Sequence, residues 1–248
     1  MKKILLEAPV FTIEAALLAD RFGVDRIELC SDFGEGGETP SVGALAYLKA
    51  MIKIPIFVMV RPRGGDFVYS EEEVEVMRRD IQILNSYGAD GFVFGVLDES
   101  GNVDQKACEV LVKEAGDKPC TFHRAFDVCS DPSIALEKII ACGFKRILTS
   151  GTRNSVSEGL SIILDLLDRA KDRIIIMPGG GLQPSHIERL KSSNQLLEVH
   201  ASCKGYRNTK STYQSKKVTL SKDPQAFNTV LTLDENIVAE FNKVLMVK

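Results

Sequence analysis

Residues 12–30, TIEAALLADRFGVDRIELC, contain one complete helix-to-strand step of the fold. Thr12 is a helix-capping residue type, and the apolar residues after it recur at helical spacing as far as Phe22. Gly23 tolerates the left-handed backbone that ends a helix, and the apolar run RIELC (26–30) predicts a buried strand. This stretch therefore predicts a helix, a glycine stop and a strand in close succession.

The same order recurs along the whole chain. Apolar runs predict strands at residues 4–8, 26–30, 55–60, 91–96, 119–124, 146–150, 173–178 and 197–201. Helical patterns between and after them fall at residues 12–22, 41–51, 71–88, 104–115, 131–141, 156–170, 184–191 and 234–244. An open doubly wound sheet would share this rhythm, but the GxGxxG turn that often follows its first strand is absent. Eight units in 248 residues favour an α/β fold of the (β/α)8 TIM-barrel type, as one domain over 1–248.

Composition narrows the range of partners. The net charge of -3 and the pI near 5.8 predict no general attraction to nucleic acid or to an anionic membrane. No apolar stretch approaches the roughly 18 residues of a membrane span, and Glu7 interrupts the N-terminal run too early for a secretion signal. The six cysteines are scattered without a CxxC pair, so we expect neither a disulfide scaffold nor a zinc knuckle. A cytoplasmic location follows as the expectation.

Polar side chains point into the predicted barrel. Alternation along RIELC puts Ile27 and Leu29 against the helices, which leaves Glu28 and Cys30 facing inward. The same parity argument turns further residues inward, namely Met59, Arg61, Thr121, His123, Glu198 and His200. Buried charges are costly unless they are paired or hydrated, so such a set indicates either a functional site or a neutral plug of paired Glu and Arg.

The mouth of the barrel is expected to bind a small anion. Arg61 and Arg63 end the third strand, and Asp66 could hold one of them in place. Further polar candidates follow the later strands, namely Arg124, Asp127, Thr149, Ser150, Gly179, Gly180 and Gly181. The three glycines offer backbone N–H groups to a phosphate, or they form only a tight turn.

Acid–base and metal chemistry remain alternatives at this mouth. His123 is the first acid–base candidate, because the ordinary pKa of histidine lies near neutrality. Glu7, Glu28 and His200 could supply a second acid–base group or the ligands of a hard divalent metal. Residues 202–222 form a basic segment after the eighth strand, which is either a ligand-binding loop or a solvated one.

Several motifs together resemble the CutC family, described as copper homeostasis proteins with a TIM-barrel fold. They are RIELCSDFGEGGETPSVG, VRPRGGDFVYS, GVLDESGNVD, TFHRAFD, RILTSG, IMPGGG and EVHAS, and they cover about the first 200 residues. The resemblance implies a cytoplasmic protein that forms a homodimer or a larger homo-oligomer, and copper(I) binding through cysteines. Cys30 is the cysteine within a matching motif, and Glu7 and Ala8 stand where some relatives carry further cysteine.

Two functions from different classes follow. Copper(I) prefers thiolate and thioether donors, and Cys30 and Met59 lie on adjacent predicted strands, although single cysteines are commonly ordinary core residues. The alternative is an enzyme that acts on a small phosphorylated or carboxylated metabolite by isomerisation, lyase chemistry or hydrolysis. An interaction scaffold is a third possibility, which would leave the polar mouth unexplained.

Overall fold

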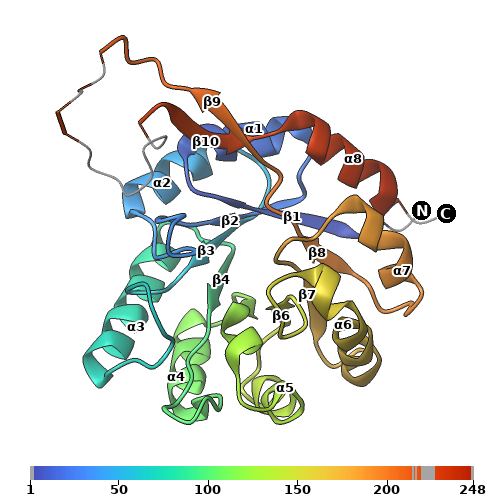
Figure 1. Cartoon of the computed structure of the whole chain (residues 1–248). Helices are drawn as coiled ribbons and strands as arrows, with labels where there is room; N and C mark the ends of the chain where they lie inside the picture. Colours follow the sequence, from blue (N-terminus) through green and yellow to red (C-terminus); the bar gives the residue numbers. More distant parts are fainter. Residues whose placement is uncertain (1–2, 214, 216, 219–226, 247–248) are drawn as a thin grey trace.

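Eight parallel strands form the centre of the molecule, and helices surround them (Figure 1). The computed structural model describes residues 3–213, 215, 217–218 and 227–246. The strands are β1 (Leu5–Val10), β2 (Arg26–Leu29), β3 (Ile56–Met59), β4 (Gly91–Phe94), β5 (Cys120–Phe122), β6 (Arg146–Thr149), β7 (Ile175–Pro178) and β8 (Glu198–His200). The predicted TIM barrel is confirmed, and most strands are shorter than the apolar runs that predicted them.

The ring of strands is nearly closed. Backbone hydrogen bonds join the strands in the order β7-β6-β5-β4-β3-β2-β1-β8. Strands β7 and β8 contact each other, but no ladder between them is formed among the described residues. Since the strands are parallel, their carboxyl ends and the loops that follow them gather at one face of the barrel.

The helices begin where the sequence provides caps. They are α1 (Ile13–Phe22), α2 (Val42–Met51), α3 (Glu71–Ser86), α4 (Gln105–Ala115), α5 (Pro132–Ala141), α6 (Val156–Ala170), α7 (Ile187–Lys191) and α8 (Glu235–Leu245). Thr12 accepts a hydrogen bond from the Ala15 backbone, and Ser70 and Glu73 form the predicted capping box. The predicted helix at 184–191 is divided into a short 3₁₀ turn (Pro184–His186) and α7.

The expected loop over 202–222 is partly a strand, which corrects the prediction. Residues Lys204–Asn208 form β9, which pairs antiparallel with β10 (Thr229–Leu233). This hairpin packs on α1, where Arg207 forms an ion pair with Glu14. Within the predicted loop, residues 214, 216 and 219–222 lie outside the described residues.

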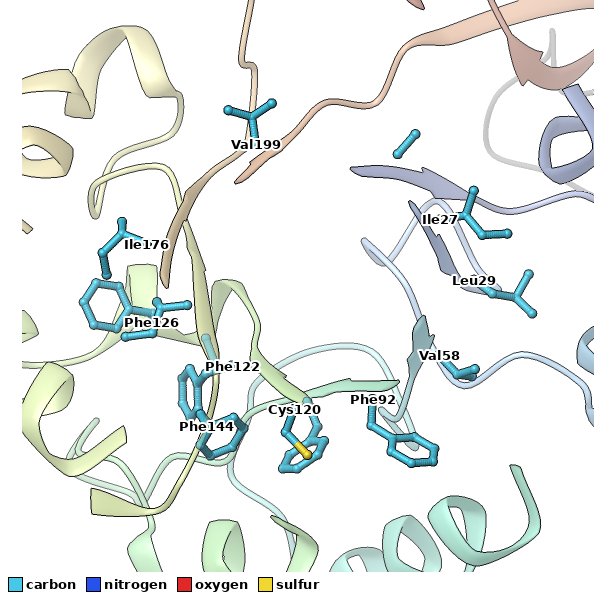
Figure 2. Close-up of a cluster of buried hydrophobic side chains, with 14 of the residues drawn as sticks. Ile27, Leu29, Val58, Phe92, Cys120, Phe122, Phe126, Phe144, Ile176 and Val199 are labelled. Atoms are coloured by element: carbon cyan, nitrogen blue, oxygen red, sulfur yellow. The ribbon is translucent and has the colours of Figure 1, made fainter. Parts of the chain in front are cut away.

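Apolar side chains fill the layer between the barrel and the helices. Ile27, Leu29, Val58, Phe92 and Phe122 point outward from successive strands into this layer (Figure 2). The opposite parity therefore faces the barrel interior, as alternation predicted. Among the described residues, no helix has the length and hydrophobicity needed to span a bilayer.

Candidate functional site

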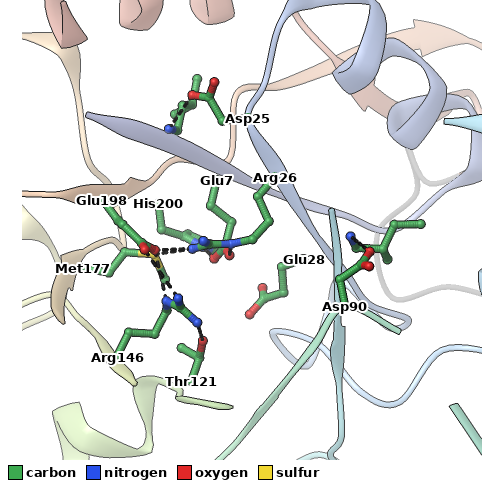
Figure 3. Close-up of polar contacts among 12 residues, drawn as sticks. Glu7, Asp25, Arg26, Glu28, Asp90, Thr121, Arg146, Met177, Glu198 and His200 are labelled. Atoms are coloured by element: carbon green, nitrogen blue, oxygen red, sulfur yellow. Dashed lines mark hydrogen bonds and ion pairs between the residues drawn. The ribbon is translucent and has the colours of Figure 1, made fainter. Parts of the chain in front are cut away.

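The interior of the barrel contains a network of paired charges. The Arg26 guanidinium donates through Nε to Glu7 and through Nη2 to Glu198 (Figure 3). Arg146 donates to Glu198 at 3.0 Å and to the Thr121 hydroxyl at 3.3 Å. This network has the form of the neutral plug of paired Glu and Arg, which was the alternative to a functional site for the inward-facing charges. It also includes two arginines that the sequence reasoning did not single out.

A signal for these arginines was present in the sequence. Arg26 has the same strand parity as Glu28, and Arg146 has the same parity as Leu148, which lines the cavity described below. Both guanidinium groups lie over the Phe57 ring, with Cζ-to-centroid distances of 4.5 Å and 4.9 Å. The aromatic face and the two carboxylates together compensate the burial of the two charges.

Glu7 connects this plug to a second group of titratable residues. Strand register places Glu7 opposite both Arg26 and His200, and the His200 Nδ1 lies 2.8 Å from Glu7 Oε1. Burial alone would raise the pKa of Glu7, but the charge of Arg26 and the contacts with His200 lower it to about 2. Glu7 is therefore ionised and accepts the hydrogen bond, so His200 donates through Nδ1.

Glu28 is the carboxylate of this group that forms no ion pair among the described residues. It is 4% exposed, and its Oε1 atom is buried without a hydrogen-bond partner among the described residues. Burial is the largest cause that raises the pKa of Glu28, to about 7, while the charge of His200 works in the opposite direction. The pKa of His200 is raised in turn, because the hydrogen bond to Glu7 and the charge of Glu28 outweigh the effect of burial. The charge of each group therefore affects the ionisation of the other.

The same residues were predicted as possible ligands of a divalent metal. Glu7, Glu28 and His200 each offer a ligand atom, and these atoms lie within 4.8 Å of one another. However, both oxygens of Glu7 are engaged, one by His200 and the other by the buried cation Arg26. Only Glu28 presents a carboxylate oxygen without a partner, so the arrangement suits proton transfer better than cation binding.

A cavity of about 390 Å³ opens at the carboxyl ends of the strands. Seven predicted site residues line it together, namely Glu28, Met59, Arg61, His123, Arg124, Asp127 and His200. Apolar side chains from Phe11, Phe33, Phe67, Val128 and Leu148 complete the wall. A cavity of this size, with few polar groups in an apolar wall, is typical of a small-molecule site.

His123 differs from the acid–base group that the sequence predicted. Burial and the nearby charge of Arg61 lower the pKa of His123 to about 3. Its Nδ1 accepts a hydrogen bond from the Ala125 backbone N–H, and its ring packs against Phe67. The imidazole is therefore neutral at physiological pH and does not act as the titrating group, because ionising it would place a second positive charge beside Arg61.

The two arginines of the RPRGGDF motif occupy different environments. Arg61 is 5% exposed and lines the cavity, whereas Arg63 is directed away from it and forms ion pairs with Asp66 and Glu73. The prediction that Asp66 holds one of the arginines is confirmed. Neither Arg63 nor Asp66 lines the cavity, so the structure does not bring these two predicted residues to it.

Asp127 organises the loop after β6. Its carboxylate accepts hydrogen bonds from the Thr149 and Ser150 hydroxyls and from the backbone N–H groups of Ser150 and Thr152. Arg124 forms an ion pair with the same carboxylate at 2.8 Å. Arg124 and Asp127 line the cavity, but Thr149 and Ser150 do not, so these two hydroxyls fix the loop rather than contact a ligand there.

The glycines 179–181 also lie outside the cavity lining. A Cβ atom on Gly179 would approach Leu148 Cδ1 to 2.5 Å and His200 Cβ to 2.9 Å. Gly179 therefore makes room for His200, and Gly180 lies against Arg124 and Ser150. The tight-turn alternative describes these glycines better than the phosphate-binding one.

The predicted soft donors lie side by side. A Cβ atom on Gly37 would meet Cys30 Sγ at 3.3 Å and Met59 Cε at 3.4 Å. Both residues pack with Phe57 and Val93 in a small apolar cluster inside the barrel. Burial and the charge of Glu28 raise the pKa of the Cys30 thiol well above its ordinary value, which disfavours the thiolate form.

The raised pKa of Glu28 gives a stability prediction for Glu28→Gln. Between pH 4.5 and about pH 7 the folded protein retains a proton that the unfolded chain has released, so this group lowers stability as the pH rises. The corresponding difference is about 3 kcal/mol. We therefore expect Glu28→Gln to gain about that much stability relative to wild type between pH 4 and pH 8 in urea unfolding. Glu99→Gln, at an exposed position, serves as the control, and an equal pH dependence in all three proteins would contradict the prediction.

Comparison with known proteins identifies relatives over most of the chain. The model of the CutC family matches residues 4–205. The human copper homeostasis protein cutC homolog is 46% identical over 216 residues, covering 87% of this chain and 79% of that protein. A protein called CutC from Xanthomonas axonopodis pv. citri is 46% identical over 200 residues, covering 81% of this chain and 83% of the relative.

Solved structures agree with this similarity. A CutC crystal structure from Streptococcus agalactiae superposes with a TM-score of 0.74 at 33% identity, covering 80% of this chain and 98% of that chain. Phosphoribosylanthranilate isomerase from Thermotoga maritima has a TM-score of 0.57 at 11% identity, covering 98% of both chains. At that level of identity the second likeness supports the barrel fold alone.

Proposed function

This chain belongs to the CutC family, whose human and mouse members are named for copper homeostasis, and from this premise we propose two molecular functions for the barrel mouth. The better supported one is acid–base catalysis on a small carboxylated or phosphorylated metabolite. The second is direct binding of copper(I), which is closer to the name of the relatives.

The position of Glu28 carries the first proposal. A carboxyl group with a pKa of about 7, a buried oxygen without a partner and a place in a cavity wall is suited to exchange protons at physiological pH. His200 lines the same cavity and is oriented by the ionised Glu7. The pair therefore provides one group that can accept a proton and one that can donate it.

The remaining cavity residues suit a small anionic substrate. Arg61 contributes a buried positive charge and His123 a neutral imidazole, and much of the remaining wall is apolar. In such a surrounding, a charge that develops on a substrate oxygen is stabilised more strongly than in bulk water. Glu28 would remove a proton from carbon while Arg61 and His123 stabilise the resulting oxyanion.

Hydrogen–deuterium exchange tests this function without knowledge of the complete reaction. The purified protein is incubated in D2O with a panel of small 2-oxo acids, hydroxy acids and sugar phosphates, and ¹H NMR follows the loss of carbon-bound protons. We expect enzyme-dependent exchange on at least one compound, and the same rate with Cys30→Ser. Exchange on none of the panel would contradict acid–base catalysis at this site.

Copper(I) binding is the second candidate, because the Cys30 thiol and the Met59 thioether lie beside each other under Gly37. Two sulfur donors suit copper(I), and deprotonation of the buried thiol on binding would supply a thiolate. Competition against a chromogenic copper(I) chelator measures this function, with one ion per chain expected in wild type and none in Cys30→Ser. Copper(I) binding that is lost in Cys30→Ser, together with no exchange on any compound of the panel, would favour this candidate over the first.

We also propose a cytoplasmic location and a homo-oligomeric state. All six cysteines are free in the structure, which suits a reducing compartment. The oligomeric state rests on the family resemblance, and light scattering of the purified protein measures it.

A further inference from the structure

Arg61 is a buried cation without a counterion among the described residues. Its Nη atoms donate instead to backbone carbonyls, those of Glu35 at 2.6 Å, Gly37 at 3.1 Å and Gly65 at 2.8 Å. The guanidinium lies over the Phe67 ring, 4.9 Å from Cζ to centroid. Its Nε–H is buried and makes no hydrogen bond in the described part of the chain, and the Tyr69 hydroxyl, which is also without a partner there, interacts with the guanidinium. Carbonyl dipoles compensate a full charge only in part, so this environment favours an anion.

His123 presents a second donor of the same kind. Since its Nδ1 accepts from the Ala125 N–H at 3.3 Å, the single proton of the neutral imidazole belongs on Nε2. That Nε2 is also buried, and no acceptor for it exists among the residues the structure describes. The ring centroid lies 4.8 Å from that of Phe67, the same ring on which Arg61 rests. Two unsatisfied N–H groups therefore flank one aromatic side chain in the cavity wall.

We propose that Arg61 and His123 form a carboxylate clamp, in which Arg61 Nε–H and His123 Nε2–H each donate to an oxygen of the substrate. This inference rests on the proposed acid–base function and names the substrate class of that site. It selects a carboxylate, or the enolate oxygen that a carboxylate-bearing substrate develops, over a phosphate ester.

The available positive charge decides between the two anions. A phosphate monoester carries nearly two negative charges and three strong acceptor oxygens. The cavity wall contains two arginines, of which Arg124 is already paired with Asp127, and the Nη groups of Arg61 are committed to the backbone. The glycines 179–181, which could have supplied further N–H donors, do not line the cavity. The single uncompensated charge of Arg61 matches a carboxylate, which carries one negative charge.

Histidine ¹⁵N NMR tests the clamp directly, because the chain contains only three histidines. Protein labelled with ¹⁵N-histidine is titrated with sodium acetate and, separately, with inorganic phosphate at constant ionic strength. We expect the His123 ring to show the neutral Nε2–H tautomer from pH 5 to pH 8. Acetate should shift its Nε2 signal, and phosphate at the same concentration should not.

Two variants separate the contributions of the donors. His123→Asn keeps a side-chain acceptor for the Ala125 N–H but is too short to replace Nε2–H, and it should weaken acetate binding about fivefold. Arg61→Lys removes the planar Nε–H donor and should weaken it about tenfold. Arg63→Lys is the matched control, because Arg63 lies two residues away and outside the cavity lining, and it should leave acetate affinity unchanged. Should Arg61→Lys not fold, His123→Asn tests the clamp by itself.

Each negative result points to one proposal. A larger shift with phosphate than with acetate, no shift with either, or a His123 ring protonated at pH 6 would overturn the clamp. If acetate does not bind while carbon–proton exchange persists in wild type and disappears in Glu28→Gln, the clamp alone fails. If acetate binds at His123 but no compound exchanges, the acid–base function alone fails.

Discussion

Replacing Arg26 with methionine is expected to destabilise the protein by about 3–5 kcal/mol, a large share of the stability of an ordinary domain. The guanidinium is the shared partner of Glu7 and Glu198, and both carboxylates lie in the barrel interior. Methionine fills much of the volume of the arginine stem but leaves one carboxylate with only His200 and the other with only Arg146. The loss is therefore dominated by carboxylates that remain buried without sufficient compensation.

Urea unfolding at pH 7 measures this effect. The double variant Arg26→Met with Glu198→Gln should recover part of the lost stability, because it removes one of the two buried carboxylates that no longer have Arg26 as a partner. Arg79→Met is the control, since the Arg79 side chain is 69% exposed and its solvent-screened ion pair with Glu75 should contribute little to stability. A loss of the same small size for Arg26→Met would show that the plug does not stabilise the barrel.

Replacing Glu28 with glutamine is expected to lower the rate of carbon–proton exchange by about 10²- to 10⁴-fold. Glutamine has nearly the same shape, so it preserves the cavity, but its amide cannot accept a proton from carbon. Binding of the substrate should change much less than turnover, because the clamp residues Arg61 and His123 are left intact. Single-turnover exchange and a separate binding titration distinguish the two effects.

The pH profile gives this prediction its specific signature. In wild type the rate should rise through about pH 7 as Glu28 loses its proton, and the raised pKa of His200 keeps that imidazole protonated to a higher pH than an ordinary histidine. The rising limb should disappear in Glu28→Gln. Glu99→Gln is the control, because the Glu99 residue is exposed and lies outside the cavity lining, and its profile should stay that of wild type. An unchanged profile in Glu28→Gln would remove Glu28 from the catalytic role.

Much of the candidate site could be predicted from the sequence. Strand alternation correctly turned Glu28, Arg61, His123 and His200 toward the interior, and the structure brings all four to one cavity. The CutC resemblance is confirmed by the family match and by the identity to curated relatives. The chemical role of each residue within the site could not be predicted in the same way. The ordinary pKa of histidine made His123 the leading acid–base candidate. In the barrel the pKa of His123 is lowered and that of Glu28 is raised to about 7, which favours Glu28 instead.

The order of strands, glycine stops and helix caps was determined by the sequence alone, because periodicity and capping depend on residues a few positions apart. Only the tertiary structure decided which charges are paired. The contact of Arg26 with Glu198 joins residues 172 positions apart, and that of Glu7 with His200 joins residues 193 positions apart. A pKa is set by burial and by neighbouring charges in space. Closing the barrel therefore leaves Oε1 of Glu28 without a hydrogen-bond partner among the described residues and keeps His123 neutral, which local sequence patterns could not show.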